Sequence, residues 1–257
     1  MSRLPWRIAA LLELLLISLL TAAAGQASFK IEAAGPPRTE VPRELRNRLE
    51  ADGTRLFRTV NGIDIPLAEL WWVRSLPLHP SAKTAAGYYR ELTPGRMLAV
   101  LYLPTALEDV QNQKIPPGFY TLRYAHFDPE KDARESEEKE KENEDKRESE
   151  EDDKHSVVKY DDYVLLARLE SDKRIDSSLK PAKMLELSRQ VSPGRKPAML
   201  ALSPLNLVYK AFPYAVSDDL GHCAVQFKLP VKFGFGQRSE MRIAIILVNP
   251  PNVSAED

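Results

Sequence analysis

Two histidines lie at the two ends of a long charged segment, and aspartates lie near both of them. His126 precedes the segment and His155 follows it, with Asp128 and Asp162 close by in the sequence. If strands flank the segment and pair with each other, the two histidines come close whatever the length of the chain between them. Imidazole and carboxylate ligands suit Zn or Cu. The pattern therefore predicts a candidate metal site at His126, His155, Asp128 and Asp162, with Asp161 as an alternative oxygen ligand. The competing interpretation is that both histidines are ordinary exposed side chains at the edge of a loop.

Two pairs of adjacent aromatic residues form a second candidate site, Trp71 with Trp72 and Tyr88 with Tyr89. Neighbouring side chains of a strand point to opposite faces of its sheet, so one indole should enter the core while the other lies toward the surface. An exposed ring of this kind offers a flat amphipathic face on which a sugar can stack. We therefore interpret Trp71, Trp72, Tyr88 and Tyr89 as candidate ligand-binding residues. The alternative is that neighbouring loops cover both indoles.

Motifs of the well-known enzyme classes are absent from the sequence. It contains no G-x-S-x-G turn, no H-E-x-x-H, no C-x-x-C, no phosphate-binding glycine loop and no dinucleotide fingerprint. The single cysteine, Cys223, lies in an apolar-leaning segment, which favours a buried thiol over a nucleophile or a metal ligand. We therefore expect no catalytic residues and no cofactor, with Zn or Cu as the alternative.

The sequence pattern predicts that the elements that position these residues are mainly β-strands. Apolar, β-branched and aromatic runs bounded by Gly and Pro predict nine of them, and Asn61-Gly62 between two such runs is a strong hairpin signal. The predicted strands span residues 54–59, 67–75, 96–103, 118–127, 157–169, 196–202, 207–212, 223–229 and 241–248.

Helical periodicity is scarce. Residues 42–49, with Leu45 and Leu49 on one face, and residues 180–190 predict two short helices. No alternation of strand and helix recurs, so a parallel α/β fold is disfavoured. The sequence therefore predicts a mainly β protein, an antiparallel β-sandwich with two short helices and a disordered or helical acidic insertion.

The acidic insertion spans residues 130–154, which contain 14 acidic and 7 basic side chains against a net charge of −1 for the whole chain. A segment with almost no apolar side chains cannot offset the entropy lost on ordering. Because strands are predicted on both sides of it, we interpret the run as an insertion between two strands of one sheet rather than as a domain boundary. The predicted organisation is a signal peptide over residues 1–27 and one domain over residues 28–257.

The N-terminus has the layout of a secretory signal. Arg3 and Arg7 precede an apolar run over residues 8–20, and small residues follow it, with cleavage after Ala24 or after Ala27 both compatible with the pattern. Glu13 inside the apolar run is unusual for such a segment. We expect an exported protein, periplasmic or extracellular, that contacts a membrane only through this segment before cleavage.

Three segments, ELTPG at 91–95, IPPGFYTLRY at 115–124 and DYVLL at 162–166, resemble a group of uncharacterised exported bacterial proteins. Where those proteins have a short linker with a histidine, this chain has the charged run before His155. The resemblance implies a β-rich exported protein and brings no known function with it.

These features together predict a non-catalytic envelope or extracellular binding module. Its partner is a carbohydrate or another envelope protein, and nucleic acid is disfavoured because the basic residues are scattered along the chain. The alternative is a metal-dependent, hydrolase-type enzyme that uses His126, His155 and the nearby carboxylates.

Overall fold

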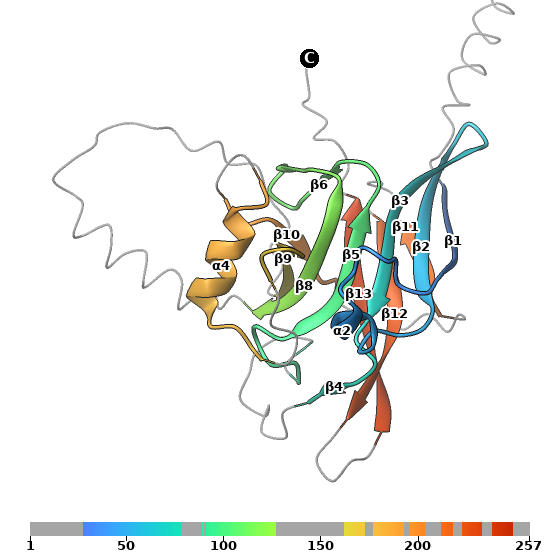
Figure 1. The fold of residues 1–257 in the computed structure, drawn as a ribbon. Coiled ribbons are helices and arrows are strands. Elements are labelled where there is room, and N and C mark those ends of the chain that lie inside the picture. The colour runs from blue at the N-terminus through green and yellow to red at the C-terminus, as the bar shows by residue number, and fades with distance from the viewer. Residues whose placement is uncertain are drawn as a thin grey trace, which may run out of the picture.

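The computed structural model describes residues 28–78, 89, 91–126, 162–172, 177–192, 196–203, 212–217, 223–232 and 238–248. The predicted signal peptide, the acidic insertion, Tyr88, Asp128 and His155 lie outside these residues. The described part is mainly antiparallel β-structure with two helices, α2 (Arg43–Arg46) and α4 (Pro181–Arg189), as the sequence predicted (Figure 1).

The larger sheet has seven strands in the order β1-β2-β3-β5-β8-β9-β10, and every neighbouring pair is antiparallel. Its strands are β1 (Ser28–Gly35), β2 (Gly53–Val60), β3 (Ile63–Trp72), β5 (Met97–Leu103), β8 (Gly118–His126), β9 (Asp162–Arg168) and β10 (Met199–Ala201). Because β8 and β9 pair directly, the acidic run joins two neighbouring strands of one sheet, which confirms that part of the prediction.

The second sheet is built on β12 (Cys223–Lys232), which pairs antiparallel with β11 (Tyr214–Ser217) and β13 (Arg238–Val248) and parallel with the short β4 (Leu76–Pro77). A bridge between Leu202 and Ile245 ties the end of the first sheet to β13. A small ladder of β6 (Leu107–Glu108) and β7 (Lys114–Ile115) forms a separate two-stranded sheet, and its Leu107 and Ile115 pack into the main core.

The hairpin between β2 and β3 forms at the predicted place. Val60 pairs with Ile63, and the two residues between them, Asn61 and Gly62, have φ values of 52° and 78°. Two consecutive residues with positive φ define the turn whose twist matches the strands it joins, and Asn-Gly is the pair that adopts it most readily.

A β-bulge in β5 decides which side chains enter the core. Met97 pairs with Arg123 and Ala99 pairs with Leu122, so Leu98 is the extra residue between them. The bulge interrupts the alternation of faces, and Leu98 and Ala99 both join the main core cluster.

The main core cluster draws side chains from both sheets. It includes Leu56 and Leu101 from the larger sheet and Val225 and Ile245 from the second sheet. Burial of such residues is the main source of stability in a chain without a disulfide.

The opposite face of the larger sheet is covered by the two helices. Trp71 and Val100 pack there with Leu45 of α2 and with Leu49. Leu165 packs with Met184 of α4, which lies over the β8–β9 end of the sheet (Figure 1). The middle strands β5, β8 and β9 are therefore buried on both faces and carry long apolar runs for that reason, whereas β1 and the tip of the β2–β3 hairpin are largely exposed.

Candidate functional site

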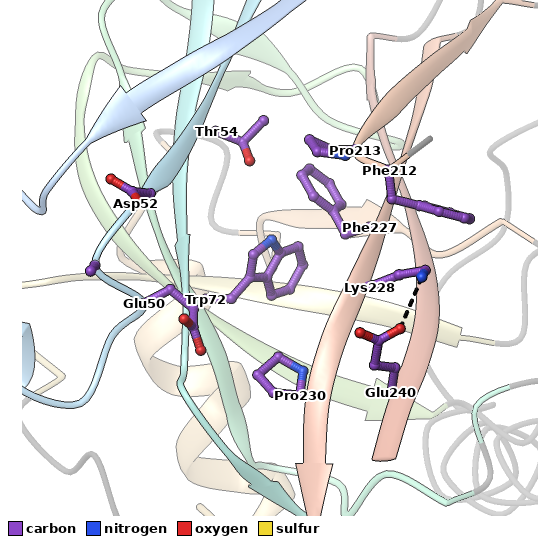
Figure 2. Close-up of a pocket in the computed structure, with 11 residues that line it drawn as sticks. Glu50, Asp52, Thr54, Trp72, Phe212, Pro213, Phe227, Lys228, Pro230 and Glu240 are labelled. Atoms are coloured by element: carbon purple, nitrogen blue, oxygen red, sulfur yellow. Dashed lines mark ion pairs between the residues drawn. The ribbon is translucent and has the colours of Figure 1, made fainter. Parts of the chain in front are cut away.

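A cavity of about 410 Å³ opens between the start of β2, the end of β3 and the second sheet (Figure 2). Its floor is aromatic and belongs to the core, whereas its rim is polar and charged. The lining residues are Glu50, Ala51, Asp52, Thr54, Trp72, Phe212, Pro213, Phe227, Lys228, Pro230 and Glu240.

Trp72 forms the centre of this cavity. Its side chain is 6% exposed, and its ring meets Phe227 of β12 edge to face with 4.8 Å between the ring centroids. The indole N–H has no hydrogen-bond partner among the described residues. Figure 2 shows this nitrogen and the Thr54 hydroxyl both facing the space between the two walls. An indole is a donor only, so a ligand that presents an acceptor here satisfies a group that the fold leaves unpaired.

The wall formed by the second sheet carries a paired charge. The Lys228 ammonium lies 2.9 Å from the Glu240 carboxylate and 5.5 Å from the centroid of the Phe212 ring. Arg242 lies on the same ring at 5.4 Å. These cations hold Phe212 at the mouth of the cavity through cation–π contacts.

Glu50 lies on the opposite wall, next to Trp72. Its backbone N–H donates to the Trp72 carbonyl at 2.7 Å, which fixes its place beside the end of β3. Within the part of the chain that the structure describes, neither Glu50 nor Asp52 has an ion pair.

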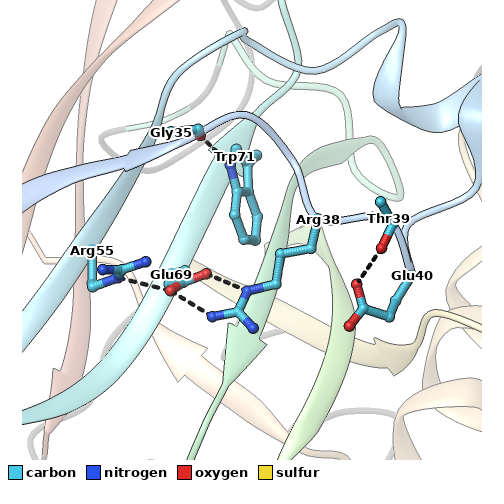
Figure 3. A network of polar contacts seen from close by, with 7 residues as sticks. All are labelled: Gly35, Arg38, Thr39, Glu40, Arg55, Glu69 and Trp71. Carbon is cyan, nitrogen blue, oxygen red and sulfur yellow. Dashed lines mark hydrogen bonds and ion pairs between the residues drawn. The ribbon is translucent and has the colours of Figure 1, made fainter.

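Trp71, the neighbour of Trp72, has a structural role on the other face of the sheet. It is fully buried, and its indole N–H donates to the Gly35 carbonyl at 2.9 Å (Figure 3). Neither indole of the pair is exposed, so the prediction of a surface ring is wrong and the alternative, both rings covered, holds. Trp72 nevertheless lines a cavity. A buried ring at the wall of a cavity is a third arrangement, which neither the exposed-ring nor the covered-ring interpretation of the sequence includes.

A carboxylate between two arginines holds the segment that covers Trp71. Glu69 accepts two hydrogen bonds from Arg38, at 2.8 and 2.9 Å, and one from Arg55 at 2.7 Å (Figure 3). Burial alone raises the pKa of the Glu69 carboxyl, but the arginine hydrogen bonds outweigh burial and hold that pKa below its ordinary value. Arg38 also stacks on Tyr102 with 4.2 Å between the guanidinium carbon and the ring centroid.

Tyr89 ties the two sheets together and faces no open surface. Its buried hydroxyl donates to the Ser203 carbonyl at 2.7 Å and accepts from the Ala244 N–H at 3.0 Å. Burial raises the pKa of this phenol well above its usual range. Tyr89 therefore lies away from the Trp72 cavity, and its predicted partner Tyr88 lies outside the described residues.

His126 and Asp162 of the predicted metal site do come together. They stand opposite each other in the β8–β9 register, with His126 Nδ1 2.9 Å from Asp162 Oδ1. Tyr124 donates to the same oxygen at 2.6 Å, and burial together with this hydrogen bond raises the pKa of the Tyr124 phenol. Asp162 thus orients the imidazole of His126 through its Nδ1 atom.

The other two predicted ligands, Asp128 and His155, lie outside the described residues. Within the described ranges, no group of three or more His, Cys, Asp or Glu side chains is placed to hold a metal ion. Cys223 is fully buried, as predicted, and burial raises the pKa of its thiol to about 12, which keeps it protonated and unreactive at neutral pH.

Comparison of the chain with protein-family models, curated proteins and solved structures finds no match in any of the three. Among the described residues, no helix has the length and apolar character needed to cross a membrane.

Sequence reasoning found Trp72 but missed the residues that make a cavity around it. The cavity brings Trp72 together with residues that are distant in the sequence, up to about 155 positions away in the case of Phe227. The residue types of Phe212, Phe227 and Glu50 do not by themselves indicate that they share a site with Trp72. Phe227 falls within a correctly predicted strand, but nothing local says which sheet its strand faces.

Proposed function

We propose that this protein is an exported, non-catalytic binding module whose ligand is a carbohydrate held in the Trp72 cavity. The observation that carries the proposal is the buried indole N–H of Trp72, which has no partner among the described residues and belongs to a ring that lines the aromatic-walled cavity. A buried donor without an acceptor costs about 1–3 kcal/mol, so a ligand that supplies the acceptor recovers this free energy.

The chemistry of the lining suits a sugar ring. The cavity of about 410 Å³ lies within the usual range of roughly 300–1,000 Å³ for small-molecule sites. A pyranose has apolar C–H faces that pack on aromatic walls such as Phe227, and hydroxyl oxygens that accept from an N–H. Its hydroxyl groups also donate to carboxylates and to the Thr54 hydroxyl.

The remaining features of the proposal come from the sequence. The proposal includes two sheets that pack as a β-sandwich on the shared core. It also includes cleavage of residues 1–27 and a periplasmic or extracellular location. The resemblance of three segments to exported bacterial proteins supports the same location.

The test compares one chemical change on two faces of the same strand. Trp72→Phe keeps an aromatic ring in the cavity but removes the N–H, while Trp71→Phe removes an N–H that donates to Gly35 on the opposite face. Calorimetric titration with a panel of β-linked oligosaccharides should show about tenfold weaker binding for Trp72→Phe than for the wild type, the effect of one hydrogen bond of about 1.4 kcal/mol. Trp71→Phe should bind as the wild type does. Equal loss in both variants would show that binding depends on general stability and not on the cavity.

The second candidate function is a metal-dependent enzyme centred on His126, and the observation in its favour is the orientation of His126 by Asp162. Titration with zinc and with copper at neutral pH tests it. Metal should bind with defined stoichiometry to the wild type and lose that binding in the double variant His126→Ala, His155→Ala. Equal binding by the double variant would assign the affinity to the acidic run.

A further inference from the structure

The charges around the Trp72 cavity are unbalanced. Its lining includes three carboxylates, from Glu50, Asp52 and Glu240, but a single ammonium, from Lys228. Because Lys228 and Glu240 are 2.9 Å apart and neutralise each other, the excess negative charge lies on the wall formed by residues 50–54.

Glu50 is the carboxylate nearest to Trp72 along this wall. It is half-buried, and its backbone N–H is fixed to the Trp72 carbonyl. Figure 2 shows the Glu50 side chain starting next to the backbone end of the Trp72 side chain, whereas the Asp52 carboxylate points away from the cavity. Among the described residues Glu50 has no cationic partner.

A ligand that fills the cavity removes water from the Glu50 carboxylate. A carboxylate that loses water without gaining a counter-charge destabilises the complex. A hydroxyl donor compensates this loss in part, while an ammonium donor supplies both a hydrogen bond and the opposite charge, and such charge-assisted bonds are about twice as strong as neutral ones. An acidic sugar would add repulsion from the same wall.

We infer that the sugar bound in the Trp72 cavity carries a free amine, with its ammonium group on Glu50 and its ring against the aromatic floor. This inference rests on the proposed function and narrows it to amino sugars. Neutral and acidic sugars lack this ion pair with Glu50 and bind the same floor more weakly.

Three β-1,4-linked tetramers test the inference, one of glucosamine, one of N-acetylglucosamine and one of glucose. They share the same linkage and differ in the group at the second carbon, so the amine charge is the main variable. Binding to the full-length protein is measured by calorimetry at about pH 6, where the amines of the glucosamine tetramer are largely protonated.

The glucosamine tetramer should bind about five- to tenfold more tightly than the other two, the range between an exposed ion pair and a charge-assisted hydrogen bond. In Glu50→Gln the three tetramers should bind with equal affinity. Glu44→Gln, the same change on the exposed side of α2 and outside the cavity, should keep the wild-type preference.

Each other outcome contradicts a defined part of the account. Equal affinity of the wild type for all three tetramers, or a preference that survives Glu50→Gln, would overturn the inference and leave the sugar cavity in place. If none of the three binds to a protein with a cooperative unfolding transition, both the inference and the proposed function are overturned.

Discussion

Replacement of each adjacent tryptophan by phenylalanine isolates the energetic role of one N–H group. Trp71 donates to the Gly35 carbonyl at 2.9 Å, while the N–H of Trp72 has no partner among the described residues. Both side chains are buried, at 0% and 6% exposure, so Trp71→Phe and Trp72→Phe lose similar apolar contacts.

The difference between the two variants follows from hydrogen bonding. Trp71→Phe breaks a bond with a net value of about 0.5–1.5 kcal/mol and leaves the Gly35 carbonyl without that donor. Trp72→Phe removes a buried donor that has lost its water without gaining an acceptor. Its removal should therefore raise the free energy of unfolding by up to about 1–3 kcal/mol, and by less where water reaches the cavity. In the absence of ligand, Trp71→Phe should therefore be the less stable variant by about 1–3 kcal/mol.

The assay is urea unfolding followed by far-ultraviolet circular dichroism, with the free energy of unfolding extrapolated to water for wild type and both variants. Similar slopes against urea would show that the denatured state is unchanged, so the midpoints can be compared directly. If Trp72→Phe is as unstable as Trp71→Phe, or less stable, the Trp72 N–H is already satisfied and the argument for a ligand acceptor is refuted.

Three further substitutions test the forces that hold the fold together. Glu69→Gln should lower the free energy of unfolding by about 1–3 kcal/mol at neutral pH. Because the pKa of Glu69 is lowered in the folded protein, its carboxylate stabilises the fold above the ordinary carboxyl pKa of about 4, and this stabilisation is lost as the pH falls through the folded pKa. The free energy of unfolding of the variant should therefore depend less steeply on pH in the acid range than that of the wild type. Asp172→Asn should lower the free energy of unfolding by about 3–5 kcal/mol, because it removes the carboxylate charge that lies 2.6 Å from the buried guanidinium of Arg123, and an unchanged urea midpoint would contradict this. Gly95→Ala should lower the melting temperature by several degrees, since Gly95 has a φ of 82° and an added Cβ would overlap the backbone of Leu179; a wild-type melting temperature would show that this turn relaxes freely.

Local signals account for the parts of the fold that the sequence predicted. The Asn61-Gly62 turn, the buried run of β5 and the amphipathic pattern of α4 each depend on residues within one element. The pairing of β8 with β9 was predictable because strand-like segments flank a run that cannot pack.

The assignment of side chains to faces was not predictable in the same way. The apolar runs of the sequence predict that Val100 and Leu165 are buried, but not on which face of the sheet. The structure buries both under the helices, on the face opposite to the main core cluster that holds Leu98 and Ile245. The bulge at Leu98 and the cover provided by α2 and α4 decide this, and both depend on tertiary packing.

The same limit applies to the candidate sites. His126 and Asp162 could be predicted to meet because they end paired strands, and their direct opposition in register puts their side chains on one face. The cavity at Trp72 could not be predicted, because Phe227 reaches it from the second sheet and Phe212 from the bend before β11. Tyr89 was assigned to a binding surface on its residue type, and its hydroxyl instead links Ser203 to Ala244.

The most direct test of the central claim observes the Trp72 N–H itself. The chain has three tryptophans, so the indole N–H resonances of the isotopically labelled protein can be assigned with the variants Trp71→Phe and Trp72→Phe. On titration with the glucosamine tetramer, the Trp72 resonance should shift in a saturable manner, as expected for a new hydrogen bond, while that of Trp71 stays in place. A saturable interaction that leaves the Trp72 resonance unmoved, or no shift of it with any of the three tetramers, would contradict the account.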